Sequence, residues 1–159
     1  MIAVVQARAG STRLPRKVLR DLGGRPVLAW TVAAAQDSAA CDRVVVATTT
    51  DPADDAVAAL ATQLGATVAR GPVDDVLTRF LRAVDAVGPA GPDDAIVRLT
   101  ADCPLLDPAL IAQCADTFRS AGFPSCWPRC SRSTPWNRSH RSSSWSRSIA
   151  GRVRARGSG

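Results

Sequence analysis

Apolar and polar positions along the chain form two kinds of pattern, one typical of strands and the other of helices. Short apolar runs rich in β-branched residues predict buried strands over residues 2–6, 43–48, 66–69 and 95–100. Longer segments with apolar positions three or four apart predict helices over residues 27–36, 73–87 and 108–119, and another that begins near Pro52 and ends at Gly65. Strands therefore alternate with helices over the first 122 residues.

This alternation favours an α/β fold. Parallel strands need connections long enough to hold a helix, and such crossovers are right-handed in nearly all proteins. We therefore predict a Rossmann-like parallel sheet with helices on both faces, built by residues 1–122. The composition fits one domain of this kind, since 46% of the 159 residues are apolar.

The composition changes abruptly after Gly122. The whole chain carries 20 Lys and Arg against 14 Asp and Glu, but residues 123–159 hold eight of the Arg and no acidic residue. This tail is rich in Arg, Ser and Trp and has little to bury, so we expect it to be disordered. Two other interpretations stay open. The tail is an out-of-frame translation of a GC-rich gene, or its Trp127, Trp136 and Trp145 stack on single-stranded nucleic acid, a partner that we do not expect.

No segment of the sequence predicts a membrane anchor or a secretory signal. A spanning helix needs about 20 apolar residues, and no long apolar segment follows Met1 or occurs elsewhere. We therefore expect a cytoplasmic protein without a membrane partner. Its five cysteines are predicted to be reduced and mostly buried, rather than to form a metal site at Cys126, Cys130 and His140.

A loop rich in positive charge follows the first predicted strand. Residues 7–17 read ARAGSTRLPRK, called the basic loop below, and combine four cations with two small residues: Arg8, Arg13, Arg16, Lys17, Gly10 and Ser11. Ligands of open α/β sheets bind at the carboxyl ends of strands, where this loop lies. Clustered cations repel one another until an anion binds, and a glycine lets backbone N–H groups approach phosphate oxygens. Although the spacing is that of neither a Walker loop nor G-x-G-x-x-G, we interpret the segment as a triphosphate site rather than as a solvated loop.

An acidic residue follows the fourth predicted strand at the same edge of the sheet. Asp102 lies in the segment RLTADCPLLD, residues 98–107. A carboxylate that faces a triphosphate needs a cation between them, and Mg²⁺ typically binds one or two carboxylates together with phosphate oxygens. We therefore predict that Asp102 is a Mg²⁺ ligand. Asp107 precedes Pro108 and is predicted to be a helix N-cap instead.

Four segments of the sequence together match the pattern of a known family. They are A-R-x-x-S-x-R-L-P-x-K at residues 7–17, V-A-T-x-x-D at 46–51, G-x-x-D-D-V-L at 71–77 and R-L-T-A-D-C-P-L at 98–105. In this order they resemble the cytidylyltransferase family, in particular its spore coat polysaccharide biosynthesis protein F type. The acylneuraminate and 3-deoxy-manno-octulosonate cytidylyltransferases are related to that type. The resemblance covers residues 1–122.

The resemblance implies a nucleotide-diphosphosugar-transferase fold and an enzyme of surface polysaccharide or glycan synthesis. Such an enzyme transfers CMP from CTP to a sugar and releases pyrophosphate. Carried over by position, the triphosphate would be held by Arg8, Gly10, Ser11, Arg13 and Lys17, of which Arg13 and Lys17 are the catalytic candidates. Thr48, Asp51 and Thr100 would lie near the nucleotide or sugar, and Asp102 would bind Mg²⁺. Asp74 and Asp75 receive no role beyond that of acids near a helix N-terminus.

The tail departs from the family pattern. Related enzymes continue with further sheet, sugar contacts, a homodimer surface and usually a second metal-binding acid, whereas no carboxylate follows Asp116 here. We therefore expect an incomplete sheet with an exposed edge, poor solubility, no certain homodimer and an impaired enzyme. The alternative functions are a nucleotide-binding remnant without turnover and nucleic-acid binding through the basic tail.

Overall fold

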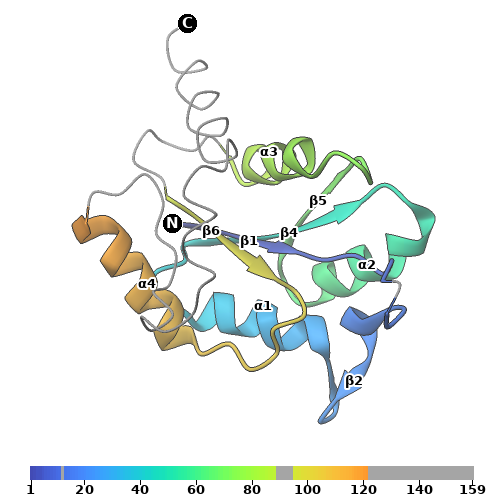
Figure 1. Ribbon diagram of the computed structural model, residues 1–159, viewed down its shortest axis with the longest axis horizontal. Coiled ribbons are helices and arrows are strands. Elements are labelled where there is room, and N and C mark those ends of the chain that lie inside the picture. Colours follow the sequence, from blue (N-terminus) through green and yellow to red (C-terminus); the bar gives the residue numbers. More distant parts are fainter. Residues whose placement is uncertain (12, 89–94, 122–159) are drawn as a thin grey trace, which may run out of the picture. The chain divides into compact units, whose positions relative to one another are not determined.

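The core of the fold is a four-stranded parallel sheet, seen in a computed structural model that describes residues 1–11, 13–88 and 95–121. Its strands lie in the order β5-β4-β1-β6, with β1 paired to β4 on one side and to β6 on the other (Figure 1). Their bounds are Ile2–Gln6 for β1, Arg43–Thr49 for β4, Thr67–Gly71 for β5 and Ile96–Thr100 for β6. The predicted parallel α/β sheet is thus confirmed.

Helices cover both faces of this sheet. The helices are α1 (Val27–Asp37), α2 (Asp55–Gln63), α3 (Val76–Ala86) and α4 (Pro108–Ala121). In Figure 1, α1 and α2 lie on one face and α3 on the other. This arrangement follows from right-handed crossovers, because the chain moves in one direction across the sheet from β1 to β4 and β5, and in the opposite direction from β5 to β6.

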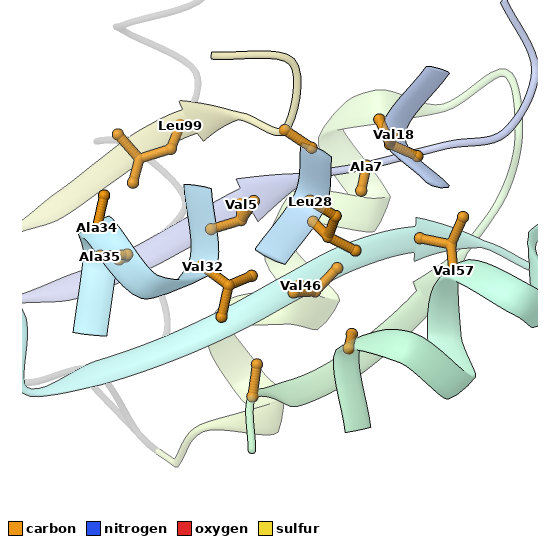
Figure 2. Close-up of a cluster of buried hydrophobic side chains, with 14 of the residues drawn as sticks. Val5, Ala7, Val18, Leu28, Val32, Ala34, Ala35, Val46, Val57 and Leu99 are labelled. Carbon is orange, nitrogen blue, oxygen red and sulfur yellow. The ribbon is translucent and has the colours of Figure 1, made fainter. Parts of the chain in front are cut away.

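Two buried clusters fill the space on either side of the sheet. Along β1 the side chains alternate, so that Val5 belongs to the cluster under α1 and α2, and Val4 to the cluster under α3. Figure 2 shows the first cluster, where Leu28 and Val32 of α1 pack against Val46 of β4. Each fully buried Val or Leu side chain contributes about 1.5–3 kcal/mol, so these clusters hold the sheet and helices together.

Two helices begin at acidic residues whose side chains cap them. Asp75 caps α3, because its carboxylate accepts hydrogen bonds from Thr78 N at 2.9 Å and Thr78 Oγ1 at 2.6 Å. Asp107 accepts from Ala109 N at 2.8 Å, directly before Pro108 opens α4. The interpretations of Asp75 as a helix acid and of Asp107 as a cap are both confirmed.

Several short elements were not predicted. They are the 3₁₀ turn η1 (Lys17–Leu19) and an antiparallel hairpin of β2 (Asp21–Leu22) and β3 (Arg25–Pro26). The 3₁₀ turn η2 (Pro52–Asp54) is the start of the helix predicted from Pro52, and α2 continues it. Gly23 and Gly24 form the hairpin turn with φ of 65° and 83°, a conformation that favours glycine. Trp30 then ties the hairpin to α1, since its Nε1 donates to Leu22 O at 2.9 Å.

Other expectations have separate outcomes. No helix in the described part of the chain is long and apolar enough to cross a membrane. Cys41 and Cys114 are half-buried and Cys103 is exposed, so the expectation of mostly buried thiols is wrong for these three cysteines. The expectations for residues 123–159, including Cys126, Cys130 and the tail, lie outside the described residues.

Gly71 ends β5 at a place where Arg79 of α3 leaves no room for a side chain. A Cβ at residue 71 would lie 2.9 Å from Arg79 Cα and 3.0 Å from Arg79 Cβ. Arg79 is itself buried, and its Nη1 donates to Pro72 O at 2.7 Å and to Val73 O at 3.2 Å. The glycine therefore allows α3 to approach the strand closely. This close approach explains why a glycine stands at the first position of the G-x-x-D-D-V-L segment.

Gly71→Ala is expected to lower the free energy of unfolding by about 1–3 kcal/mol, because the backbone of α3 must shift to admit the methyl group. Gly10→Ala is the matched control, since a Cβ there would meet no described atom within 4 Å. Chemical denaturation of the parent and both variants measures the difference. Equal stability of Gly71→Ala and the parent would contradict the close approach.

Candidate functional site

The carboxyl ends of β1 and β6 define a candidate binding edge. The chain leaves β1 toward α1 and β4 on one side, and later returns to place β6 on the other side of β1. The strand order therefore reverses between β1 and β6, and ligands of open α/β sheets bind outside the carboxyl ends of strands at such a point. The basic loop follows β1, and the segment with Asp102 follows β6.

Lys17 and Asp102 meet at this edge although 85 residues separate them in the sequence. Lys17 Nζ lies 2.5 Å from Asp102 Oδ2, and both side chains are partly exposed. The hydrogen bond from Lys17 is the largest cause that lowers the pKa of Asp102 below its ordinary value; burial opposes this shift, and a hydrogen bond with Thr100 adds to it. The carboxylate therefore stays ionised next to the cation.

Hydrogen bonds within the basic loop give it a defined shape. Arg16 N donates to Ala9 O at 2.9 Å, and Leu14 N donates to Ser11 Oγ at 3.3 Å. Arg16 adopts a φ of 55°, a left-handed conformation that is uncommon for a residue with a side chain. The loop thus turns back on itself between Ala9 and Arg16.

The loop directs its charges outward. Arg8, Arg13 and Arg16 are exposed, and Lys17 is half-buried. Gly10 is exposed with open space where a Cβ would stand, and Ser11 is half-buried. The side chains predicted to hold a triphosphate therefore lie on one short segment next to Asp102 and Thr100, accessible to a ligand.

Two other predicted residues lie at the end of β4 with different surroundings. Asp51 is exposed, and its Oδ1 accepts from Ala53 N at 2.8 Å, so it caps η2. Thr48 is fully buried, and within the described part of the chain its Oγ1 has no hydrogen-bond partner. The structure therefore brings Thr100 together with Asp102, but it gives Asp51 a capping bond and places Thr48 in the interior.

Sequence reasoning missed a buried acid and a buried base. Asp54 is 3% exposed, and its carboxylate accepts hydrogen bonds from Ala9 N at 2.5 Å and from Thr49 Oγ1. Burial lowers the pKa of Arg79, the positive charge of Arg8 lowers it further, and Asp54 and Asp75 oppose the shift. No spacing in the sequence marks Asp54, because its partner Ala9 lies 45 residues away.

A buried threonine anchors the segment that carries Asp102. Thr31 of α1 is fully buried, and its Oγ1 lies 3.4 Å from Ala101 O and 3.3 Å from Cys103 O. The two carbonyls flank Asp102 in the sequence. The helix that follows the basic loop therefore also fixes the backbone on both sides of the acid.

Asp102 fits a Mg²⁺ ion as one ligand among several. In residues 1–11, 13–88 and 95–121, no three His, Cys, Asp or Glu side chains form a group that could hold a metal ion. Mg²⁺ does not require such a group, because it binds through one or two carboxylates, substrate phosphates and water. An ionised, partly exposed Asp102 beside a basic loop meets that requirement.

Comparison with known proteins identifies the class. A family model described as Cytidylyltransferase matches residues 2–144, which is most of the chain. The chain belongs to this family. The match extends beyond residue 122, where the sequence analysis placed the end of the resemblance.

Two curated relatives illustrate the similarity. The chain is 40% identical over 115 residues to spore coat polysaccharide biosynthesis protein SpsF of Bacillus subtilis, covering 70% of this chain and 46% of the relative. It is 36% identical over 121 residues to a 3-deoxy-manno-octulosonate cytidylyltransferase of Vibrio cholerae, covering 76% of this chain and 46% of that enzyme. The chain thus spans about half the length of the curated relatives it matches.

Solved structures agree with the fold. A cytidylyltransferase from Leptospira borgpetersenii superposes with a TM-score of 0.69 at 34% identity, covering 77% of this chain and 50% of the other. A CMP:2-keto-3-deoxy-manno-octonic acid synthetase complexed with CTP gives a TM-score of 0.64 at 26% identity, covering 76% of this chain and 48% of the other. The sheet and helices described above are therefore those of cytidylyltransferases.

Thr48→Val is expected to raise the free energy of unfolding by up to about 1 kcal/mol, because it replaces an unpaired buried hydroxyl with a methyl group of similar shape. Thr49→Val is the matched control, and it should destabilise the protein because Thr49 donates to Asp54. Denaturant titration measures both effects. A destabilised Thr48→Val would show that the hydroxyl has a partner.

The pair of Lys17 and Asp102 predicts a dependence of stability on pH. Because folding depresses the pKa of Asp102, its contribution is complete above the ordinary value of 3.8 and is lost as pH falls through the folded-state pKa. The side chains are 36% and 42% exposed, so Asp102→Asn should cost less than about 1 kcal/mol at neutral pH.

Urea unfolding at neutral pH and at successively lower pH measures this contribution, and Asp85→Asn on the exposed side of α3 is the control. The difference between the parent and Asp102→Asn should shrink as the solution becomes acidic. A difference that grows instead would mean that the pair does not hold the carboxylate in its ionised form.

Proposed function

We propose that this chain binds the triphosphate of CTP on the basic loop and transfers CMP to a sugar with release of pyrophosphate. The contact of Lys17 with Asp102 is the observation that carries the proposal, because it joins the two predicted halves of the site at one sheet edge. The solved relative complexed with CTP supports the choice of nucleotide. The names of the curated relatives support a sugar of surface polysaccharide synthesis as acceptor.

The electrostatics of the basic loop suit a polyanion. Arg8, Arg13 and Arg16 are exposed, so they keep their donors available to phosphate oxygens, and Arg binds such oxygens with a forked geometry. Lys17 adds a compact charge that Asp102 holds at the edge of the sheet. A triphosphate would relieve the mutual repulsion of these cations, which is a gain that a neutral ligand cannot supply.

Mg²⁺ is the metal that the proposal includes. Asp102 would hold it together with phosphate oxygens of the nucleotide and water. When bound, the ion supplies positive charge to the phosphates during transfer. Thr31 keeps the backbone on both sides of Asp102 in place through its contacts with Ala101 and Cys103, so the carboxylate is presented from a fixed segment.

In the proposed reaction, a sugar hydroxyl oxygen forms a bond to the α-phosphorus as the bond to the leaving pyrophosphate breaks. The hydroxyl proton passes to solvent, and the pyrophosphate leaves with the electron pair of the broken bond. The chain's part is positioning and charge stabilisation, in which Arg13 and Lys17 face the negative charge that builds on the phosphates. No covalent intermediate with the protein is needed.

Nucleotide binding without turnover is the second candidate function. The observation that favours it is that, within the described residues, Asp102 is the one acid paired with Lys17 of the basic loop. Pyrophosphate release distinguishes the two candidates, because both predict binding of CTP and one alone predicts the product.

Lys17→Ala and Arg13→Ala are each expected to weaken CTP binding at least about tenfold in the presence of Mg²⁺, because a charge-assisted hydrogen bond contributes about 1.5–3 kcal/mol. Arg82→Ala, which removes an exposed cation from α3, is the matched control. Isothermal titration calorimetry with CTP measures the affinities. If both loop variants bind CTP as tightly as the parent, the triphosphate is held elsewhere.

A further inference from the structure

A buried carboxylate attaches the basic loop to the neighbouring strand connection. Asp54 is the last residue of η2, and its Oδ1 accepts a hydrogen bond from Ala9 N at 2.5 Å. Its other oxygen accepts from Thr49 Oγ1 at the end of β4. The contact therefore joins the loop after β1 to the turn after β4, two segments 45 residues apart in the sequence.

The position of Asp54 at a helix start does not explain its burial. It directly precedes α2, where an acid ordinarily accepts from the first helical N–H groups, but its side chain makes no capping hydrogen bond. The carboxylate points to the basic loop instead. Burying a carboxylate is costly unless its oxygens are hydrogen-bonded, and here both oxygens are.

Asp54 binds Ala9, the residue at which the basic loop begins to turn back on itself. Ala9 is 4% exposed; its N–H donates to Asp54, and its carbonyl accepts from Arg16 N at 2.9 Å. The second bond closes the segment between Ala9 and Arg16, and the first fixes that closed segment to the sheet edge. The exposed cations Arg8 and Arg13 lie next to and within this segment, so their placement depends on both bonds.

The charged side chains near Asp54 also connect it with the basic loop. Arg8 acts on the buried Arg79 as a nearby positive charge, and Asp54 acts on Arg79 as a nearby negative charge. Asp54 therefore lies near the same buried guanidinium that Arg8 of the basic loop approaches. An acid at this position accepts a hydrogen bond from the loop backbone and opposes the effect of Arg8 on the pKa of Arg79.

We infer that Asp54 is a positioning residue that holds the basic loop, through the amide of Ala9, in the conformation that binds a triphosphate. The ligand in this inference rests on the proposed function. The hydrogen bond and its effect on the loop do not rest on the proposed function. The positioning role and the proposed function can therefore fail separately. Asp54 itself would make no contact with the nucleotide.

Two substitutions separate the hydrogen bond from the charge. Asp54→Asn keeps an oxygen that can accept from Ala9, whereas Asp54→Ala removes both the acceptor and the charge. Asp55→Asn is the matched control, because Asp55 is the exposed neighbour whose Oδ1 pairs with Arg70 Nη2 at 2.7 Å. Calorimetric titration with CTP and Mg²⁺ and hydrogen exchange of the Ala9 amide by NMR are measured on each full-length chain.

CTP affinity is expected to fall at least about tenfold in Asp54→Ala, to fall less in Asp54→Asn and to stay unchanged in Asp55→Asn. The Ala9 amide should exchange slowly in the parent and in Asp54→Asn, and rapidly in Asp54→Ala while amides of β1 stay protected. Rescue by Asn distinguishes an oriented acceptor from a general loss of packing.

Unchanged CTP affinity in Asp54→Ala would overturn the inference. If the parent does not bind CTP, the proposed function fails, and the exchange of the Ala9 amide then decides the positioning role by itself. If Asp54→Ala does not fold, slow exchange in both the parent and Asp54→Asn supports the hydrogen bond, and rapid exchange in either overturns it.

Discussion

The parallel pairing of β1 with both β4 and β6 is the interaction on which the rest of the structure depends. Residues of β1 pair with β4 from Ile2 to Gln6 on one side and with β6 over the same span on the other. Because all three strands run in one direction, the loops that follow them emerge at one edge. Segments that are far apart in the chain can then place a lysine and an aspartate within hydrogen-bonding distance.

Two buried polar side chains support the loops at this edge. On the α1 side, Thr31 holds the carbonyls around Asp102, and α1 itself begins shortly after the basic loop ends. At the end of β4, η2 supplies Asp54 to the amide of Ala9. The candidate site therefore consists of exposed charged side chains supported by buried polar ones, and the buried groups come from segments outside the four motifs or from positions the motifs leave unspecified.

Much of the fold could be predicted because its signals are local. β-branched runs mark β1 and β4, and Asp107 before Pro108 marks the start of α4. The hairpin of β2 and β3 escaped prediction because its strands are two residues long, too short to show any alternation. Boundaries such as the start of α3 shifted by a few residues, since the cap at Asp75 decides where the helix begins.

The charged residues of the candidate site could be predicted from the sequence, but the buried polar residues that hold its loops could not. Arg8, Arg13 and Lys17 cluster within a few residues, so the sequence reveals them directly. Asp54 acts through a partner 45 residues away, which no local pattern reveals. The burial of Thr48 was within reach, because alternation along β4 puts it on the same inward face as Val46.

At position 16 a positive charge is kept at the cost of an unfavourable backbone conformation. An arginine with φ of 55° occupies a region that glycine adopts at little cost, and a non-glycine residue there carries a penalty of about 1 kcal/mol or more. Glycine would ease the turn but would delete a cation from the sheet edge. An arginine in this left-handed conformation therefore makes the loop less stable by itself, so the loop depends on its contacts with neighbouring segments to stay folded.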